Sequence, residues 1–133
     1  PSLVGSEMCI RDRARGGISM SKTIDHLIET ECKLSQIKYW LKAEHHLTME
    51  EFIILYRFNG TDKITGKVLR DTLHYDMKWN TSKIDVLIRK LYKRELIAKE
   101  RSETDERQVF YLLDKTQREF VASVIKEFET FAK

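Results

Sequence analysis

The amino-acid sequence predicts a mostly helical α+β fold, with a long helix near each end and a single β-hairpin. Three observations support this fold class. The chain has 133 residues, which is enough for one domain. Hydrophobic residues make up 41% of it and charged residues 34%, as in a soluble, helix-rich protein. The apolar residues follow a helical period up to Leu96 and then alternate over two short stretches.

The composition excludes several classes of protein. The single proline and the five glycines exclude collagen-like and proline-rich chains. No apolar stretch approaches the roughly 18 residues that span a membrane, so we expect no membrane partner. The two cysteines, Cys9 and Cys32, are too few for a disulfide scaffold, which favours a reducing compartment.

The first 19 residues differ from the rest of the chain. They show no apolar period, and Ser6–Arg13 resembles translated sequencing-adapter sequence. Met20 resembles a translation start. We expect residues 1–19 to be a non-native or disordered leader, and residues 20–133 to form a single domain.

The positive charge is concentrated in the middle of the chain. Residues 63–101 carry eleven Lys or Arg against five Asp or Glu, whereas residues 20–62 and 102–133 are each mildly acidic. A central cationic block of this kind is typical of a protein that binds a polyanion. The alternative is a charged helix face that is merely solvated.

The first predicted helix runs from about Thr23 to Glu44. Its length gives it more apolar surface than its own small domain needs, so we expect a partner subunit to cover part of it. The apolar residues along one face of this helix are Ile24, Leu27, Leu34, Ile37 and Leu41.

Two short helices are predicted next. Thr48 and Glu51 have the spacing of a capping box that opens a helix ending at Asn59-Gly60. The residues expected to fill this short buried helix are Phe52, Ile53, Leu55 and Tyr56. Lys63-Ile64 is long enough only for a small edge strand.

Thr65 then opens a helix through Leu73, with Val68 and Leu69 also on its inner face. His74 to Trp79 is predicted to be a short turn. Two short helices joined by a tight turn, the second rich in cations, indicate a helix-turn-helix.

The next helix is the most informative segment. Asn80 or Thr81 can cap it, and it should end near Arg94. One face is apolar and must be buried; it holds Ile84, Leu87, Ile88 and Leu91. The opposite face carries Ser82, Val86, Arg89 and Lys93, and Asp85 and Lys90 flank it. The residues of this helix that we expect to contact DNA are Ser82, Lys83, Val86, Arg89, Lys90 and Lys93.

Within that face, two side chains suit base recognition. In a major groove Val86 could contact a thymine methyl group, and Arg89 could reach a guanine edge or a phosphate. The alternative for Val86 is an ordinary exposed apolar residue.

A β-hairpin follows the cationic helix. Ile97 to Arg101 and Gln108 to Leu113 are predicted strands, joined by the polar loop Ser102–Arg107. A hairpin directly after a helix-turn-helix is a wing, so we expect a winged helix-turn-helix. Its cations, Lys99, Arg101 and Arg107, could enter a minor groove or hold phosphates, or they could belong to an ordinary charged loop.

The last predicted helix starts at a second capping box, Asp114 to Gln117. Its broad apolar face needs a cover, and the first helix of the same chain or of a partner is the natural one. The expected dimer-interface residues on the two terminal helices are Leu27, Leu34, Phe120, Val124, Phe128 and Phe131.

No catalytic or cofactor motif is present in the sequence. It lacks a glycine-rich phosphate loop, the Gly-x-Ser-x-Gly motif and the His-Glu-x-x-His motif, and its His and Cys residues lack a zinc spacing. We therefore expect neither an enzyme nor a cofactor or metal protein. Cys32 is interpreted as a half-buried structural residue; a redox sensor would need exposure and a depressed pKa.

Three segments together resemble the staphylococcal accessory regulator (Sar) family, small winged-helix transcription factors related to the multiple-antibiotic-resistance (MarR) regulators. These segments are Glu50-Glu51-Phe52, Lys78–Lys93 and Arg101–Arg107. The resemblance covers about residues 21–133. It implies a cytoplasmic homodimer in which the cationic helix enters the major groove and the wing enters the adjacent minor groove.

The resemblance also implies control of virulence or autolysis genes and specific roles in the wing. Arg107 would be the minor-groove arginine in A·T-rich duplex DNA, with Asp105 and Glu106 as orienting partners. The family's sensing cysteine lies nearer the start of the first helix than Cys32. The competing hypothesis is a winged-helix module that binds protein and no nucleic acid.

Overall fold

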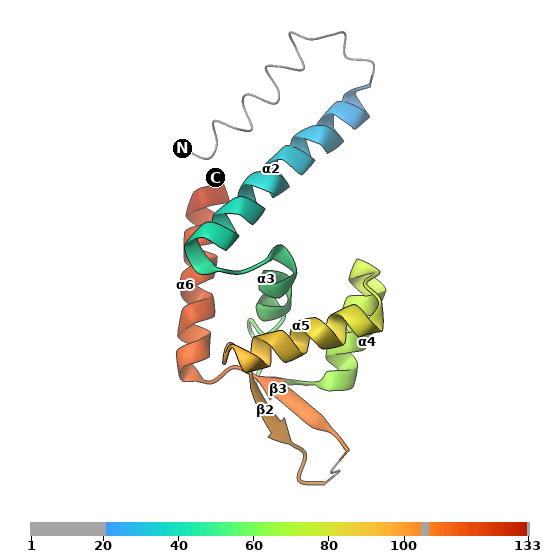
Figure 1. Ribbon diagram of the computed structural model, residues 1–133, viewed down its shortest axis with the longest axis vertical. Coiled ribbons are helices and arrows are strands. Elements are labelled where there is room, and N and C mark those ends of the chain that lie inside the picture. The colour runs from blue at the N-terminus through green and yellow to red at the C-terminus, as the bar shows by residue number, and fades with distance from the viewer. Residues whose placement is uncertain (1–20, 105–106, 133) are drawn as a thin grey trace. The chain divides into compact units, whose positions relative to one another are not determined.

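The computed structural model describes residues 21–104 and 107–132 (Figure 1). Its helices and strands confirm the predicted mostly helical α+β fold. They are α2 (Lys22–His45), α3 (Met49–Tyr56), β1 (Lys63–Thr65), α4 (Gly66–Met77), α5 (Thr81–Lys93), β2 (Ala98–Arg101), β3 (Val109–Leu112) and α6 (Lys115–Ala132). The predicted leader, residues 1–19, lies outside the described residues. None of the described helices has the length and apolar character needed to cross a bilayer.

The chain divides into two compact units. One contains α2 and the last turn of α6, from Phe128 onward; the other is Glu50–Glu127. The second unit holds β1 to β3, α4 and α5, which are the elements of the predicted winged helix-turn-helix.

In the first unit, α2 begins and ends at well-defined caps. The Ser21 hydroxyl accepts a hydrogen bond from the Ile24 amide at 3.2 Å, and His46 ends the helix in the left-handed region. At its C-terminal end, Trp40 stacks on Phe131, with ring centroids 4.9 Å apart, and lies edge-on to Phe128. The sequence left open whether the first helix of the same chain or that of a partner covers the last helix. The structure shows that α2 of the same chain covers the end of α6.

In the second unit, α4 is longer than predicted. The Thr65 hydroxyl caps its start, accepting from the Val68 amide at 3.1 Å, as expected. The helix continues through Met77 and ends at Lys78 in the left-handed region, so the predicted turn from His74 to Trp79 is wrong. No glycine or proline interrupts this stretch, and the helix ends only where the backbone of Lys78 turns.

Two side chains expected in the core are exposed instead. Val68 is 55% exposed, because Leu69 and Leu73, four residues apart, define the inner face of α4 and Val68 lies beside it. Tyr56 is 52% exposed, since it is the last residue of α3. The centre of its ring lies 6.3 Å from that of Phe52.

The buried face of α5 is as predicted. Ile84, Ile88 and Leu91 are buried, and Leu87 is half-buried. The cap is Asn80 rather than Thr81, because its side-chain oxygen accepts from the Lys83 amide at 2.7 Å. Figure 1 shows α5 lying across α4, with the hairpin extending beyond both.

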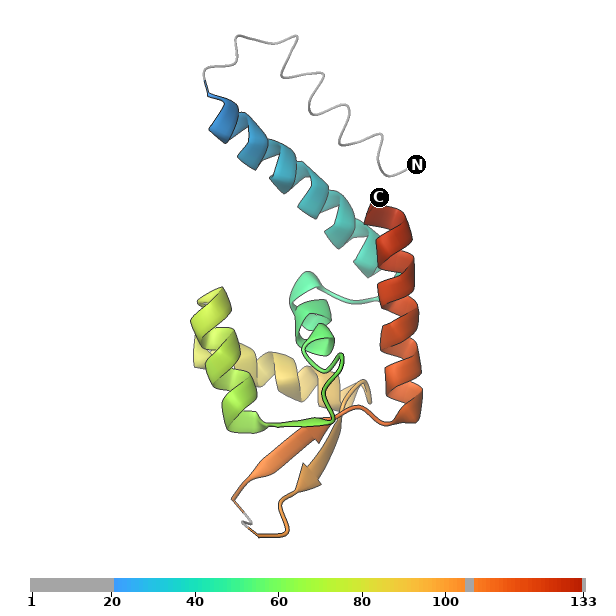
Figure 2. The same cartoon turned by 180° about the vertical axis from the view of Figure 1, so that it is seen from behind.

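The three strands form one antiparallel sheet in the order β1-β3-β2. Leu112 of β3 pairs with Lys63 on one side and Ala98 on the other, so β1 is an edge strand as predicted. Seen from behind, β1 leads straight into α4 beside the hairpin (Figure 2). The hairpin that follows α5 confirms the predicted winged helix-turn-helix.

The second capping box is also confirmed. The Gln117 amide donates to the Asp114 carboxylate at 2.8 Å, and the Gln117 side-chain oxygen accepts from the Asp114 amide at 2.9 Å. The remaining Gln117 amide group donates to the Glu95 carbonyl at 2.9 Å. The start of α6 is thereby attached to the segment that leaves α5.

Candidate nucleic-acid interface

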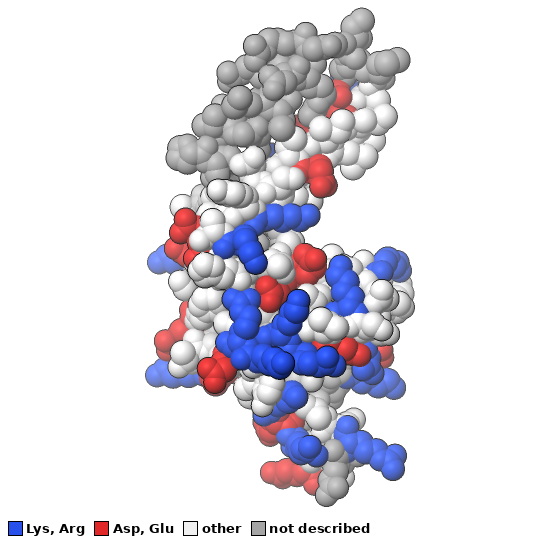
Figure 3. Space-filling view, in the orientation of Figure 1, with Lys and Arg blue, Asp and Glu red and all other residues white. Residues whose placement is uncertain are grey.

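The outer face of α5 is exposed along its whole length. The structure brings the predicted contact residues of this helix onto its surface, namely Ser82, Lys83, Val86, Arg89, Lys90 and Lys93. Val86 stands between them with 43% of its surface exposed. Figure 3 shows Lys and Arg side chains gathered over α5 and again on the hairpin. A helix with an exposed cationic face suits the major groove, which is wide enough to admit it.

Two consecutive carboxylates of α3 hold α5 at its two ends. Glu50 lies 3.8 Å from the Lys83 ammonium at the start of α5, and Glu51 accepts a 3.1 Å hydrogen bond from Arg94 at its end. Glu51 is buried, whereas Glu50 is half-buried and Lys83 is exposed. Lys83 also lies 5.0 Å from the centre of the Trp79 ring. These contacts fix the helix against α3 and engage Lys83, one of the predicted contact residues. They leave Val86, Arg89, Lys90 and Lys93 exposed.

A second set of charges connects α4, α5 and β3. The Arg70 guanidinium lies 3.6 Å from the Asp85 carboxylate. Tyr111 of β3 lies near both: burial raises the pKa of its phenol, and the Asp85 charge raises it further, while Arg70 and Arg89 oppose the shift. Arg89 thus has a polar neighbourhood on its inner side as well as an exposed outer side.

The predicted cations of the wing lie at three different places. The Lys99 ammonium lies 4.2 Å from the centre of the Tyr92 ring, so the Lys99 side chain packs against α5. Arg101 is exposed at the end of β2, paired in register with Val109. Arg107 is exposed and lines a pocket that reaches back to α4. Asp105 and Glu106, the predicted orienting residues, lie outside the described residues.

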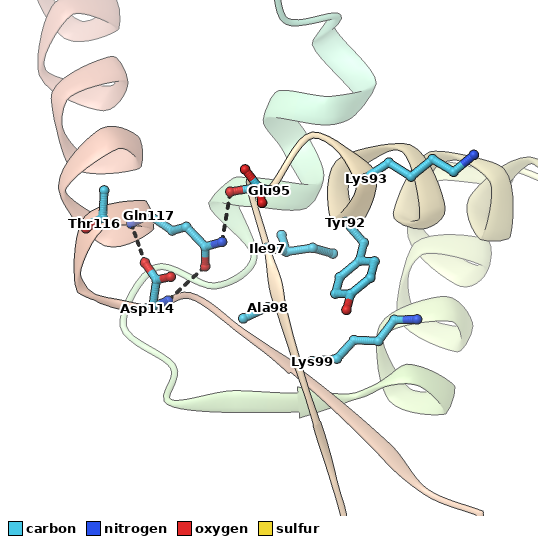
Figure 4. A pocket seen from close by; sticks show the side chains of 9 residues that line it. All are labelled: Tyr92, Lys93, Glu95, Ile97, Ala98, Lys99, Asp114, Thr116 and Gln117. Carbon is cyan, nitrogen blue, oxygen red and sulfur yellow. Dashed lines mark hydrogen bonds between the residues drawn. The ribbon is translucent and has the colours of Figure 1, made fainter.

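A pocket of about 710 Å³ opens beside the end of α5 (Figure 4). Lys93 and Lys99 lie at its edge, and Gln117 and Asp114 form its wall. The amide group of Gln117 is engaged with Asp114 and Glu95. The polar groups of this wall thus connect α6 to the end of α5.

The residues predicted for the dimer interface differ in how much surface they offer. Leu27 is 62% exposed, and Leu34 lies exposed on the same helix together with Ile24 and Ile28. Phe120, Phe128 and Phe131 are half-buried. Val124 is buried within this chain, so it offers little surface to a partner subunit.

Sequence reasoning missed three residues that the structure places beside the predicted ones. Lys67 and Arg70 of α4 share a pocket with Arg107, and Tyr111 lines the same pocket. The signal for the two cations was available: they lie three residues apart inside the cationic block, as neighbours on one helix face. Tyr111 sits in an apolar strand, and nothing in the sequence distinguishes it.

Known proteins are similar to this chain both in sequence and in fold. The family described as transcriptional regulator SarA/Rot matches residues 36–124. A Staphylococcus aureus protein named HTH-type transcriptional regulator SarV is 52% identical over 113 residues, covering 85% of this chain and 97% of that protein.

Among solved structures, a MarR family regulator from Streptomyces coelicolor, AbsC, superimposes with a TM-score of 0.65 at 19% identity, over 86% of this chain and 78% of that one. The multiple antibiotic resistance repressor MarR gives 0.66 at 13% identity, over 88% and 80%. At this level of identity the two structures confirm the fold alone.

Proposed function

Because this chain belongs to the SarA/Rot family of transcriptional regulators, we propose that it binds A·T-rich duplex DNA as a homodimer and thereby controls transcription. Family membership confirms the predicted class, a transcriptional regulator rather than an enzyme. The observation that carries the proposal is the exposed cationic face of α5, which α3 holds at both ends without covering it.

The two DNA-reading elements have different tasks in this proposal. Val86 and Arg89 enter the major groove, where each base pair presents a distinct pattern, and select bases there. Arg107 enters the adjacent minor groove, where a narrow A·T-rich tract has an enhanced negative potential. Lys90, Lys93, Lys99 and Arg101 hold phosphates and supply affinity without base preference.

The exposed apolar face of α2 supports the homodimer. Ile24, Leu27, Ile28 and Leu34 expose a stripe that a symmetric copy of the same helix can cover. An obligate interface of this kind buries on the order of 2,000 Å² or more. Leu34→Glu should give a monomer by light scattering, and so should Phe128→Glu if it folds. A wild-type chain that is monomeric at micromolar concentration would contradict the proposal.

The salt dependence of binding tests the function itself. A dimer that uses roughly three to five cations per subunit neutralises about six to ten phosphates, so the logarithmic salt slope should be about −5 to −9. The measurement is fluorescence anisotropy on A·T-rich and G·C-rich duplexes over a series of salt concentrations. A slope near zero would favour the alternative, a module that binds only protein.

The cellular part of the proposal is regulation of virulence or autolysis genes in the cytoplasm. Immunoprecipitation of the DNA bound by this protein, followed by sequencing, should recover promoters of such genes. Recovery of unrelated promoters would leave the DNA-binding proposal in place and remove this part of it.

A further inference from the structure

Two adjoining pockets connect α5 to the base of the wing. They share Gly66, Arg70 and Tyr111. The first, of about 340 Å³, is also lined by Asp85, Arg89 and Lys99. The second, of about 300 Å³, is also lined by Lys67 and Arg107. Five cationic side chains and one carboxylate therefore line these two adjoining pockets, which we call the groove.

The backbone at the start of α4 closes directly onto Tyr111. A Cβ atom at Gly66 would lie 3.2 Å from a ring carbon of Tyr111, so only a glycine leaves the ring in this position without displacing it. The ring of Tyr111 therefore packs against the backbone at the start of α4. Tyr111 and Arg70 together form the middle of the groove, between Arg89 at one end and Arg107 at the other.

The position of this groove matches a feature of duplex DNA. A helix in the major groove and a hairpin in the next minor groove are separated by one sugar–phosphate strand. Arginine binds phosphate oxygens with two parallel hydrogen bonds, and a tyrosine hydroxyl can donate another. We infer that the groove around Arg70 and Tyr111 binds backbone phosphates of that strand; this inference rests on the proposed function.

Asp85 gives the groove a feature that ordinary phosphate contacts lack. Its carboxylate lies 3.6 Å from the Arg70 guanidinium and lines the same pocket, where it repels a phosphate. A phosphate that enters this pocket must therefore replace the Asp85 carboxylate as the partner of the Arg70 guanidinium. Loss of Arg70 weakens DNA binding, and loss of the Asp85 charge strengthens it.

The opposite signs make the inference testable. Arg70→Ala should weaken binding to all duplexes by about tenfold and lower the salt slope by about one per subunit, because a phosphate contact is lost. Asp85→Asn should tighten binding about threefold, because an anion leaves the groove. Neither change should alter the preferred bases in a selection on randomised duplexes.

Arg57→Ala is the matched control. It removes an arginine in a comparable ion pair, 2.9 Å from Asp76, but Arg57 lines neither pocket. Its DNA affinity should stay within about twofold of wild type, since it lies outside the groove. The side chains of Arg70 and Asp85 are 39% and 47% exposed, so loss of their ion pair should leave the unfolding midpoint near that of wild type.

Tyr111→Phe provides a second variant if Arg70→Ala fails to fold. It keeps the ring against Gly66 and removes only the hydroxyl, and binding should weaken about threefold. If Arg70→Ala and Asp85→Asn change affinity in the same direction, or if either has no effect, the groove is structural and the inference is wrong. A wild-type protein that does not bind DNA would instead refute the proposed function.

Discussion

The hydrogen bond between Arg94 and Glu51 should be the more important of the two contacts that hold α5 against α3. Its two members differ in exposure: the Glu51 side chain is 6% exposed and that of Arg94 is 39% exposed. Removing the arginine leaves a charge in a buried site, whereas removing the carboxylate leaves a charge that water can reach. Removing the arginine should therefore lower the free energy of unfolding more than removing the carboxylate.

The magnitudes follow from this difference in burial. Arg94→Met keeps the apolar stem but removes the guanidinium, and it should lower the free energy of unfolding by about 2–3 kcal/mol, somewhat less than for a fully buried pair. Glu51→Gln keeps an oxygen that can accept from Arg94 and should cost about 1 kcal/mol or less.

The neighbouring ion pair provides a matched control. Lys83 and Glu50 join the same two helices at the other end of α5. Their side chains are 43% and 37% exposed, so Lys83→Met should lower the free energy of unfolding by about 0 to 1 kcal/mol. The assay is equilibrium unfolding in urea at one fixed protein concentration, because the stability of the proposed homodimer depends on concentration. If Arg94→Met costs no more than Glu51→Gln or Lys83→Met, burial of Glu51 does not set the strength of this contact.

Three further predictions concern DNA binding and its regulation. Asn80→Ala should lower stability by about 1 kcal/mol in thermal unfolding, because the cap of α5 is lost, whereas Asn80→Asp should keep the cap but weaken DNA binding by placing an anion near phosphates. Arg107→Ala should weaken binding to all A·T-rich duplexes alike, whereas Arg89→Ala should change the preferred bases, at about 1–3 kcal/mol for each lost contact. Cys32→Ser should leave DNA affinity and its response to peroxide unchanged, because Cys32 is half-buried and is interpreted as structural.

Each of these three has a result that would contradict it. Equal stability of Asn80→Ala and wild type would show that the cap does not matter. If Arg107→Ala changes the preferred bases and Arg89→Ala does not, the wing rather than α5 selects the bases. A peroxide-dependent loss of binding that disappears in Cys32→Ser would make Cys32 a sensor.

The sequence by itself determined the features that depend on neighbouring residues. The four-residue spacing of Ile84 and Ile88 predicted the buried face of α5, and its opposite face is exposed as expected. The capping box from Asp114 to Gln117 could be predicted from four consecutive residues, because its hydrogen bonds form within one helical turn. The change to an alternating period after Leu96 predicted the hairpin to within one residue at each end of its strands.

The extent of α4 could not be predicted in this way. His74, Tyr75 and Asp76 have no strong preference for helix or turn, and the sequence offers no glycine or proline there to decide between them. The exposure of Tyr56 and Val68 likewise depends on which helix packs on which face. Local propensity is weak at such positions, and tertiary packing overrides it.

Only the tertiary structure shows the contacts that position the proposed DNA-binding face of α5. Glu51 and Arg94 are 43 residues apart, and Gly66, Arg70 and Tyr111 come from a helix and a strand separated by α5 and β2. Each of these residues looks like an ordinary charged, small or apolar position in the sequence. Their partners are brought together by the packing of α3, α4 and β3 around α5, and an interaction between distant segments leaves no periodic trace in a single chain.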